Sequence, residues 1–496
     1  MVGTVTLVLP AVILLGAAFL VYLLSRALRL SNRAEALLTA LVLTGSLTSL
    51  LILFSQMPGL LGESDVSFGL DAPGGILYKP NAIGLFVLIL STVITLLVAL
   101  YSAEYLKNDS RYLLYYPLLL LTQVGLFGIF MSKDLFNLFL LTELTTVAAS
   151  ALIAFRIHQE IAIKAGFKYL LMSSLGTMIM LLGIYFVYRS TGDLRLVAFL
   201  DAPDRFTRIG SACFLVGFSL KAGVVPLHTW VPDVYGHAPS AVSGLLAGVM
   251  SKSMLLILPV VCLRLGMSRL ELGVFLMVFG CGNMVLGSVR MLGQSLLRRF
   301  LSFSSIAQTG YLMFGLGIGF YYELSEAYSA GLFLFLVIAL MKSLAFLSAG
   351  IYEFQIGSQE INRLVGAGRR MRWTGLAFST GLASLAGIPL LAGFTSKWLI
   401  FSAALRTGDV FAGICLAIFL VSTVIGLAGY LPLLVKQYLP GTEGLPVGTS
   451  GGSSKRVSPW MLGPVLLLAL LILGVGLYPA PWIGLVETVV SWMVFL

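Results

Sequence analysis

Charged residues are scarce in this sequence. Only 10% of its 496 residues are Asp, Glu, Lys or Arg, and 58% are hydrophobic, whereas soluble proteins carry about 25% charged residues. A helix needs about 20 mainly apolar residues to cross a lipid bilayer, and such stretches recur along the whole chain. The composition therefore predicts an all-α integral membrane protein embedded in the lipid bilayer, without a soluble module.

The sequence also lacks the residue patterns that bind metals and redox cofactors. Its four cysteines stand singly in apolar segments, with no CxxC spacing and no neighbouring histidine, so neither a metal site nor a disulfide framework is indicated. No iron–sulfur cysteine pattern and no nucleotide-binding GxGxxG between a strand and a helix is present. We therefore expect no cofactor and no metal on this chain. Whether it belongs to an enzyme stays open, because catalysis would fall to its partners.

A nucleic-acid partner is excluded by how the positive charge is distributed. The formal net charge is +10, but the 31 Lys and Arg residues are scattered over many loops. Phosphate binding needs them gathered in a patch or stripe. We expect partners within the membrane instead.

Apolar windows, separated by charged or Gly/Pro-rich breaks, predict about fourteen transmembrane helices. The first window lacks a basic segment before it and a small-residue cleavage site after it, so it is interpreted as a span and not as a removed signal. The tail 479–496 is either a short fifteenth span or an interfacial segment, and the interfacial interpretation is favoured. The predicted spans lie near 4–28, 35–54, 81–101, 112–131, 135–155, 166–188, 208–227, 240–262, 271–292, 301–322, 327–351, 376–402, 409–435 and 460–479.

The loops differ in their content of Lys and Arg. Those that follow odd-numbered spans hold nearly twice as many as those that follow even-numbered spans. Basic loops stay in the cytoplasm, so we expect a multi-pass protein of the cytoplasmic membrane with both termini outside. The segment 441–454, GTEGLPVGTSGGSS, has the composition of a flexible cytoplasmic loop.

Several charged residues lie within the apolar spans, where each costs roughly 2.5 to 3.5 kcal/mol. Glu143, in LFLLTELTTVAAS, falls near mid-membrane. Lys168 is close to the start of its span, where a structural ion pair or a snorkelling side chain explains it as well as a relay role does. For the others a role in ion transport is favoured over a structural one. They are Lys221, Lys252, Lys342 and Lys397, together with Glu143.

Two of these lysines accompany helix-breaking residues. Gly223 and Pro226 follow Lys221, and the run GIPLLAGFTSKW places Gly and Pro residues just before Lys397. A helix broken at mid-membrane exposes backbone groups, which is tolerated only beside a polar cavity or within protein. Two such breaks five spans apart, in predicted spans 7 and 12, are typical of a duplicated transporter unit.

The charges suggest a proton relay. A glutamate and a lysine about 4 Å apart attract by roughly 4 kcal/mol at an effective dielectric near 20, which is enough to shift a proton equilibrium. Making and breaking a pair of Glu143 and Lys221 would thus drive proton uptake and release at the lysine. His228 follows the broken helix and is a candidate relay because imidazole titrates near neutral pH; a capping or loop-packing role explains it almost as well.

Three stretches resemble a known family of membrane subunits. They are KAGVVPLHTWVPDVYGHAPSAVSGLLAGVMSK (221–252), RRFLSFSSIAQTGY (298–311) and GIPLLAGFTSK (387–397). With the acid of the fifth span, they are similar to the antiporter-like subunits shared by respiratory complex I, Mrp-type cation/proton antiporters and membrane-bound hydrogenases. The resemblance covers roughly residues 80–435.

This resemblance implies an architecture of fourteen helices with two inverted five-helix repeats, spans 4–8 and 9–13. The chain then divides into N-terminal helices (1–110), a first repeat (111–265), a second repeat (266–436) and a C-terminal helix with its tail (437–496). The resemblance also implies roles. Glu143 and Lys221 form the pair of the first repeat, Lys252 links the two half-channels, and Lys342 and Lys397 serve the second.

Two positions depart from the family pattern. Ile338 stands four residues before Lys342, where relatives commonly carry histidine, and Leu296 replaces an acid that often precedes the basic pair of the tenth span. The second half-channel is therefore expected to be drier or differently connected than in the family.

Three functions remain open. The first, which the overall character of the signature segments favours, is an Mrp-like module that moves protons, with Na⁺ as a further candidate ion, either free-standing or within an energy-converting hydrogenase or reductase. The second is a proton-pumping subunit of an NADH/quinone oxidoreductase. The third is a scaffold that keeps the fold without conducting. All three imply other membrane subunits as partners, and no set of oxygen ligands for Na⁺ stands out in the sequence.

Overall fold

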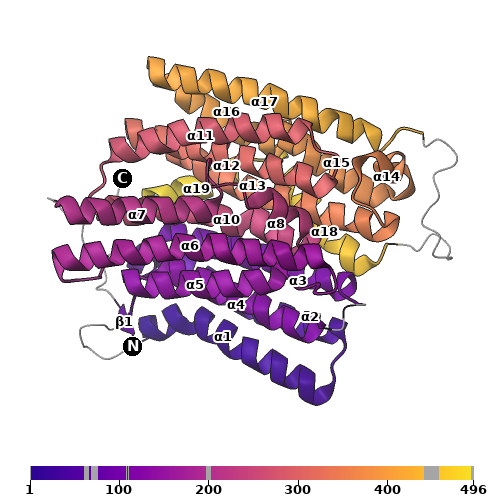
Figure 1. The fold of residues 1–496 in the computed structure, drawn as a ribbon, viewed down its shortest axis with the longest axis horizontal. Helices are drawn as coiled ribbons and strands as arrows, with labels where there is room; N and C mark the ends of the chain where they lie inside the picture. The colour runs from indigo at the N-terminus through magenta and orange to yellow at the C-terminus, as the bar shows by residue number, and fades with distance from the viewer. Residues whose placement is uncertain are drawn as a thin grey trace.

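The computed structural model describes residues 2–60, 66–68, 76–107, 109, 111–196, 203–440 and 457–492. Nearly all of these residues are helical, and most of the long helices run along the same axis of the molecule (Figure 1). Eleven helices of the described part are long and apolar enough to cross a membrane. The predicted all-α membrane fold is therefore confirmed.

Long helices and a few short elements follow one another along the chain. The first half contains α1 (Val2–Leu28), α2 (Asn32–Leu60), β1 (Val66–Phe68), β2 (Ile76–Tyr78), α3 (Ala82–Tyr105), α4 (Tyr112–Met131), α5 (Leu135–Ile153), α6 (Glu160–Thr191), α7 (Arg205–Ala222), α8 (Val231–His237), α9 (Ser240–Leu245), η1 (Leu246–Met250) and α10 (Ser251–Arg264). The second half contains α11 (Arg269–Leu292), α12 (Leu297–Tyr322), α13 (Ser325–Ile356), η2 (Ile361–Leu364), α14 (Ala367–Arg370), α15 (Arg372–Ala386), α16 (Ala392–Arg406), α17 (Val410–Lys436), α18 (Pro459–Leu477) and α19 (Ala480–Ser491).

Both predicted helix breaks are present. α7 ends at Ala222 and helical structure resumes in α8, while α15 ends at Ala386 and α16 begins at Ala392. The helix before each break, α7 or α15, is followed by a glycine in the left-handed region, with φ of +73° at Gly223 and +82° at Gly387. Glycine adopts this conformation without the penalty that a Cβ would bring. Local sequence thus determines where these two helices stop.

The predicted count of fourteen spans exceeds the eleven helices that meet the length and hydropathy criteria. The other three predicted spans fall on α7, on α12 and on the broken pair α15 and α16. The break leaves α15 and α16 short, and polar and charged side chains lower the apolar content of α7 and α12. The number fourteen, the two inverted repeats and the four-part division of the chain stay predictions.

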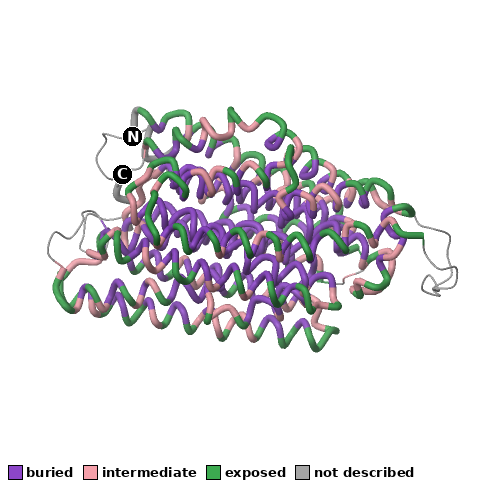
Figure 2. The backbone as a smooth tube through the Cα atoms, turned by 90° about the horizontal axis from the view of Figure 1, so that it is seen from above, coloured by how far each residue is buried: buried purple, intermediate pink, exposed green. Residues whose placement is uncertain are grey.

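The centre of the molecule is formed by a few helices that other helices surround. The most apolar window of α13 is 100% buried and that of α9 to α10 is 94% buried, whereas the windows of α6 and α17 are 39% and 33% buried. Buried residues run through the middle of the molecule and exposed ones line its outer helices (Figure 2). Lys252 on α10 and Lys342 on α13 are therefore enclosed by other helices, with 1% and 0% exposure.

Both chain ends of the described part lie at the same end of the molecule along its longest axis. α1 begins next to β1, which pairs antiparallel with β2, and α19 lies on the other side of several helices (Figure 1). α19 packs against α13 and α3, and its 12 residues are too few to cross a bilayer. It does not form a fifteenth span.

The sequence did not predict the two strands, and the predicted flexible loop 441–454 lies outside the described residues.

Candidate functional site

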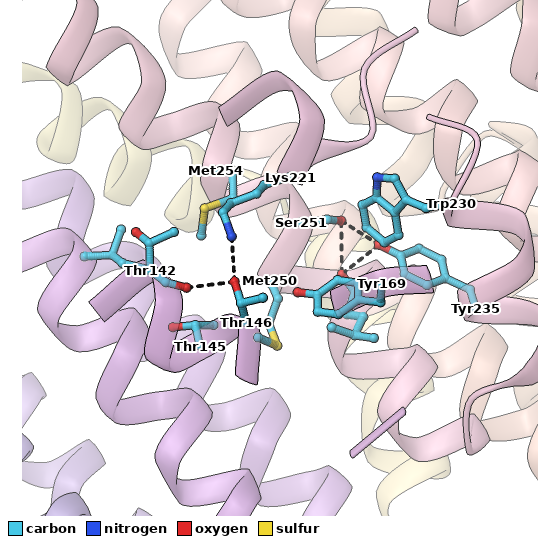
Figure 3. Close-up of a pocket in the computed structure, with 12 residues that line it drawn as sticks. Thr142, Thr145, Thr146, Tyr169, Lys221, Trp230, Tyr235, Met250, Ser251 and Met254 are labelled. Carbon is cyan, nitrogen blue, oxygen red and sulfur yellow. Dashed lines mark hydrogen bonds between the residues drawn. The ribbon is translucent and has the colours of Figure 1, made fainter. Parts of the chain in front are cut away.

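Lys221 lies in the last turn of α7 and is enclosed by hydroxyl groups. Its Nζ donates to Thr146 Oγ1 of α5 and to Ser173 Oγ of α6, both at 2.6 Å. These two hydroxyl oxygens are themselves 3.0 Å apart. Lys221 is only 8% exposed, and Figure 3 shows its ammonium group pointing at Thr146. Three helices thus contribute one polar group each to this cluster.

Glu143 lies on α5 beside the same cluster but does not pair with Lys221. Its carboxylate accepts hydrogen bonds from Ser174 Oγ (2.9 Å) and Thr177 Oγ1 (2.5 Å) of α6. No ion pair within 4 Å joins it to Lys221. Thr146, three residues further along α5, occupies the position next to the ammonium group instead. The predicted direct pair is therefore replaced in this conformation by neighbouring hydroxyls.

A small cavity adjoins Lys221 on the side of the next lysine. Its volume is about 20 Å³, and its lining includes Thr146, Lys221, Tyr235 and Ser251 (Figure 3). A space of this size holds about one water molecule when polar groups face it. The Tyr235 hydroxyl donates to Ser251 Oγ at 2.9 Å. The cavity therefore leads from the Lys221 cluster to the residue that precedes Lys252.

Lys252 follows the π-helical turn η1 at the start of α10 and is 1% exposed. Its Nζ donates to Ser251 Oγ at 3.2 Å and to Ser305 Oγ of α12. It also lies 5.8 Å from the centre of the Tyr235 ring, within range of a cation–π contact. A π-turn inside an α-helix is rare and frequently marks a functional site. Here it comes directly before the buried lysine.

Lys342 lies in the middle of α13 and is fully buried. Its Nζ donates to the Leu301 carbonyl at 3.2 Å and to Ser304 Oγ of α12. Ser304 is in turn hydrogen-bonded to the Tyr430 hydroxyl of α17. Because Ser304 directly precedes Ser305, two adjacent serines of one helix contact Lys342 and Lys252 respectively.

Lys397 lies on α16, just after the second helix break. Its Nζ donates at 3.0 Å to the carbonyl of Leu385, at the end of α15, and lies 5.0 Å from the centre of the Tyr311 ring. The last carbonyls of a helix have no partner within the helix and carry partial negative charge. The break thus provides an acceptor for the ammonium group.

The two candidate relay residues lie apart from these contacts. Lys168 is partly exposed and pairs with Asp233 of α8, whose other oxygen lies 3.8 Å from Arg299 of α12. This ion-pair network favours the structural explanation of Lys168. His228 lies between α7 and α8, half-buried, and its Nδ1 has no hydrogen-bond partner among the described residues. Its relay role stays a prediction.

The two departures from the family pattern are accommodated locally. Ile338 is fully buried one turn before Lys342. Leu296 precedes α12, and its backbone forms an isolated antiparallel β-bridge with the backbone of Glu360. The buried Arg298 pairs instead with Glu353 of α13, at 3.1 Å. A carboxylate from another helix therefore meets the basic pair where the family commonly has one nearby in sequence.

The partners of the lysines were not recognised in the sequence. Ser and Thr are common in membrane helices, where they bond to carbonyls of their own helix. The one available signal is the serine pair within RRFLSFSSIAQTGY, and a serine pair alone does not indicate a lysine partner. The serines and threonines that contact the lysines are Thr146, Ser173, Ser251, Ser304 and Ser305.

A many-helix membrane protein whose interior holds a row of lysines among hydroxyls has the features of an ion-transport protein. The family described as "NADH:quinone oxidoreductase/Mrp antiporter, TM" matches residues 132–426, more than half of the chain. The chain belongs to this family.

Known relatives agree with this assignment. "NADH-quinone oxidoreductase subunit N 2" of Chloroherpeton thalassium is 33% identical over 420 residues, which are 81% of this chain and 80% of that protein. A chain of the archaeal membrane-bound sulfane sulfur reductase has the same fold, with a TM-score of 0.85 and 25% identity over 98% of this chain and 97% of that one. A chain of the Mrp complex from Dietzia sp. DQ12-45-1b superposes with a TM-score of 0.82 and 23% identity, covering 99% and 97%. This protein is thus an antiporter-like subunit of the complex I and Mrp type, and similar chains occur in multisubunit membrane complexes.

Proposed function

We propose that this chain is a proton-translocating subunit of a quinone-reducing membrane complex of the complex I type. The relatives that match most of the chain support this assembly, because several carry the name NADH-quinone oxidoreductase subunit N. The Mrp-like module that the sequence favoured has weaker support, since the match to the Mrp chain at 23% identity supports the fold alone.

The observation that carries the transport function is the row of buried lysines linked by hydroxyls. A hydroxyl both donates and accepts hydrogen bonds, so it can receive a proton on one side and release another. The proposed path runs from Lys221 through the cavity to Ser251 and Lys252. From there it passes along Ser305 and Ser304 to Lys342, and onward to Lys397.

In this proposal, the distance between Glu143 and Lys221 controls whether the lysine keeps or releases its proton. In the described conformation, hydroxyls of α5 and α6 hold Glu143 and Lys221 apart. A small shift of α6 against α5 would bring the carboxylate to the ammonium group, and the attraction of roughly 4 kcal/mol at 4 Å would favour charged Lys221. Separation would favour proton release toward Lys252.

Partner subunits complete the proposed function. Electron transfer and quinone chemistry are assigned to them, because this chain has no sequence pattern for a redox cofactor. Protons are the proposed ion, with Na⁺ as the alternative that an Mrp-like role would require. A chain that has kept the fold without conducting is the other alternative.

The test compares Lys221→Ala with Lys164→Ala in the intact complex, reconstituted in proteoliposomes. Lys164 is the control, because it is an exposed lysine in a helical pair with Glu160. We expect Lys221→Ala to reduce the number of protons moved per electron to background, and Lys164→Ala to leave it unchanged. Quinone reduction and proton flux are recorded together, with and without Na⁺.

Each outcome distinguishes one alternative. Unchanged proton flux in Lys221→Ala would mean that the chain is a scaffold and that the ion path lies in a partner. A strict requirement for Na⁺ would support the Mrp-like role. Equal losses in both lysine variants would indicate a general defect in assembly, and the proposal would then have no support from this lysine.

A further inference from the structure

Glu35 is a buried acid that the proposed proton path does not use. It lies near the start of α2, outside the residues that the family matches, and has 0% exposure. Neither carboxylate oxygen has a well-formed hydrogen bond to any described residue. The Ser25 hydroxyl of α1 lies beside it, and the Thr39 hydroxyl is one turn along α2; among the described residues these hydroxyls have no well-formed hydrogen bond either. Four oxygen atoms without such a bond in the described part of the chain are thus gathered within one helix hairpin.

Nothing among the described residues neutralises this acid. α2 packs against α1, α3 and α4, and no Lys, Arg or His of the described chain lies within ion-pair distance of Glu35. Two basic residues of this end pair with another acid: Arg33 and Lys107 contact Glu104 at 2.8 and 3.4 Å. On α1, Arg26 reaches Tyr22 instead.

The facing residue of α4 does not supply a partner either. Tyr116 is the ionisable neighbour of Glu35 on that helix, but its hydroxyl donates to Asn32 Oδ1 at 2.9 Å. The Asn32 amide in turn donates to the carbonyls of Ser102 and Ala103 on α3. The side chains of Tyr116 and Asn32 therefore bond to each other, and Asn32 also bonds to the backbone of α3.

An isolated ionised carboxylate is costly in a protein interior, and such a group commonly becomes neutral instead. A bound proton meets this requirement and supplies an O–H donor for the Ser25 hydroxyl. A metal cation is a poorer fit, because hard cations take about six or more oxygen ligands. The side chains here provide the two carboxylate oxygens and two hydroxyls.

The hydroxyls also continue along α2. Glu35, Thr39 and Ser46 are spaced by four and seven residues, so they share one face of the helix. Ser46 is fully buried and its hydroxyl has no partner among the described residues, and Ser49 donates to the Ser46 carbonyl at 2.8 Å. Buried polar atoms without protein partners are commonly satisfied by ordered water. This face of α2 thus carries further buried hydroxyls, and Thr39 is the one next to the acid.

We propose that Glu35 is a proton-binding site of the N-terminal helix bundle, separate from the lysine row, which holds its proton at neutral pH beside the hydroxyls of Ser25 and Thr39. The site does not depend on the proposed transport function, because no lysine of the row takes part in it.

Infrared difference spectroscopy of the intact complex in nanodiscs tests this site. The spectrum at neutral pH is compared with that at alkaline pH for wild type, Glu35→Gln and Glu360→Gln. Glu360 is the control, because it is an exposed carboxylate paired with Arg363. We expect wild type and Glu360→Gln to lose a carboxylic-acid carbonyl band on alkalinisation, and Glu35→Gln to lack that band. Glu143→Gln identifies any part of the signal that belongs to the other intramembrane acid.

Two results would overturn the proposal. Identical difference spectra of wild type and Glu35→Gln would mean that Glu35 is ionised at neutral pH or does not titrate. Loss of the band on adding Na⁺ at constant pH would identify a cation site instead of a proton site. If Glu35→Gln does not assemble, Glu35→Asp replaces it: the acid is kept, so the band must remain and shift in frequency, and an unshifted band would contradict the assignment.

Discussion

The buried lysines of this protein are held by neutral oxygen atoms. Lys221 contacts two hydroxyls, Lys252 and Lys342 contact adjacent serines of α12, and Lys397 contacts a backbone carbonyl. A hydroxyl accepts a hydrogen bond from a charged ammonium group and donates one to a neutral amine. A carboxylate would instead hold the lysine in its charged form. The hydroxyls around Lys221, Lys252 and Lys342 thus permit changes of protonation without loss of contact, whereas the carbonyl beside Lys397 only accepts.

Ser173→Ala tests this role of the hydroxyls. The change removes one of the two side-chain acceptors of Lys221. Hydrogen bonds to charged groups contribute about 1.5–3 kcal/mol, and each 1.36 kcal/mol is a factor of about ten in rate. We therefore expect proton transport to slow by about tenfold or more, with the complex still assembled. Proton flux in proteoliposomes measures the effect.

The control for Ser173→Ala is Thr44→Ala. Thr44 is exposed on α2 and its hydroxyl donates to the Ala40 carbonyl of its own helix, so we expect no change in flux. Equal rates for wild type and Ser173→Ala would show that this hydroxyl is dispensable for proton transfer at Lys221.

At the scale of elements, two broken helices each carry a buried lysine close to the break. α7 and α15 end at Gly223 and Gly387 because these residues adopt positive φ. Gly223 also lies close to α8: a Cβ built on it would come within 2.6 Å of Val231 Cγ2. The short α8 is therefore packed directly on the end of the helix that carries Lys221.

Gly223→Ala is expected to destabilise the protein more than Gly192→Ala. Both residues have positive φ, so each alanine pays a conformational cost of roughly 1–2 kcal/mol. At Gly192 no atom of the described residues lies within 4 Å of the added Cβ, whereas at Gly223 the side chain of Val231 must move. The midpoint of thermal inactivation in detergent measures the difference. Equal midpoints for the two variants would mean that α8 adapts without cost.

At the scale of the whole molecule, the proposed path runs through the best-buried helices. α10 and α13 carry Lys252 and Lys342, and the apolar windows of both helices are 94% and 100% buried. Peripheral helices such as α6 and α17 present apolar side chains outward, for example Leu171 and Val424. Lipid or partner subunits can cover these surfaces without contact with the lysines.

The orientation in the membrane is a prediction of the whole chain, because it rests on the Lys and Arg content of all loops. With both termini outside, Arg406 is outside and Arg111 is inside, and both are exposed. We expect a membrane-impermeant thiol reagent to label Arg406→Cys but not Arg111→Cys in intact cells. Permeabilised cells provide the control, in which both must react. The reverse labelling pattern would show that the termini are inside.

The sequence by itself determined the class of fold, the positions of the buried lysines and the two helix breaks. Each of these depends on neighbouring residues: about 20 apolar residues make a span, and glycine with proline ends a helix. It also identified the family, although it favoured the Mrp-like assembly over the quinone-reductase one that the relatives support better.

The tertiary structure alone decided which groups meet. Hydroxyls and not Glu143 contact Lys221, two neighbouring serines contact Lys252 and Lys342, and Glu35 has no well-formed hydrogen bond to any described residue. These contacts join residues that are up to 75 positions apart in the chain. They depend on how each helix is rotated against the next, and that rotation is fixed by the packing of all the surrounding side chains together, which no local pattern of residues encodes.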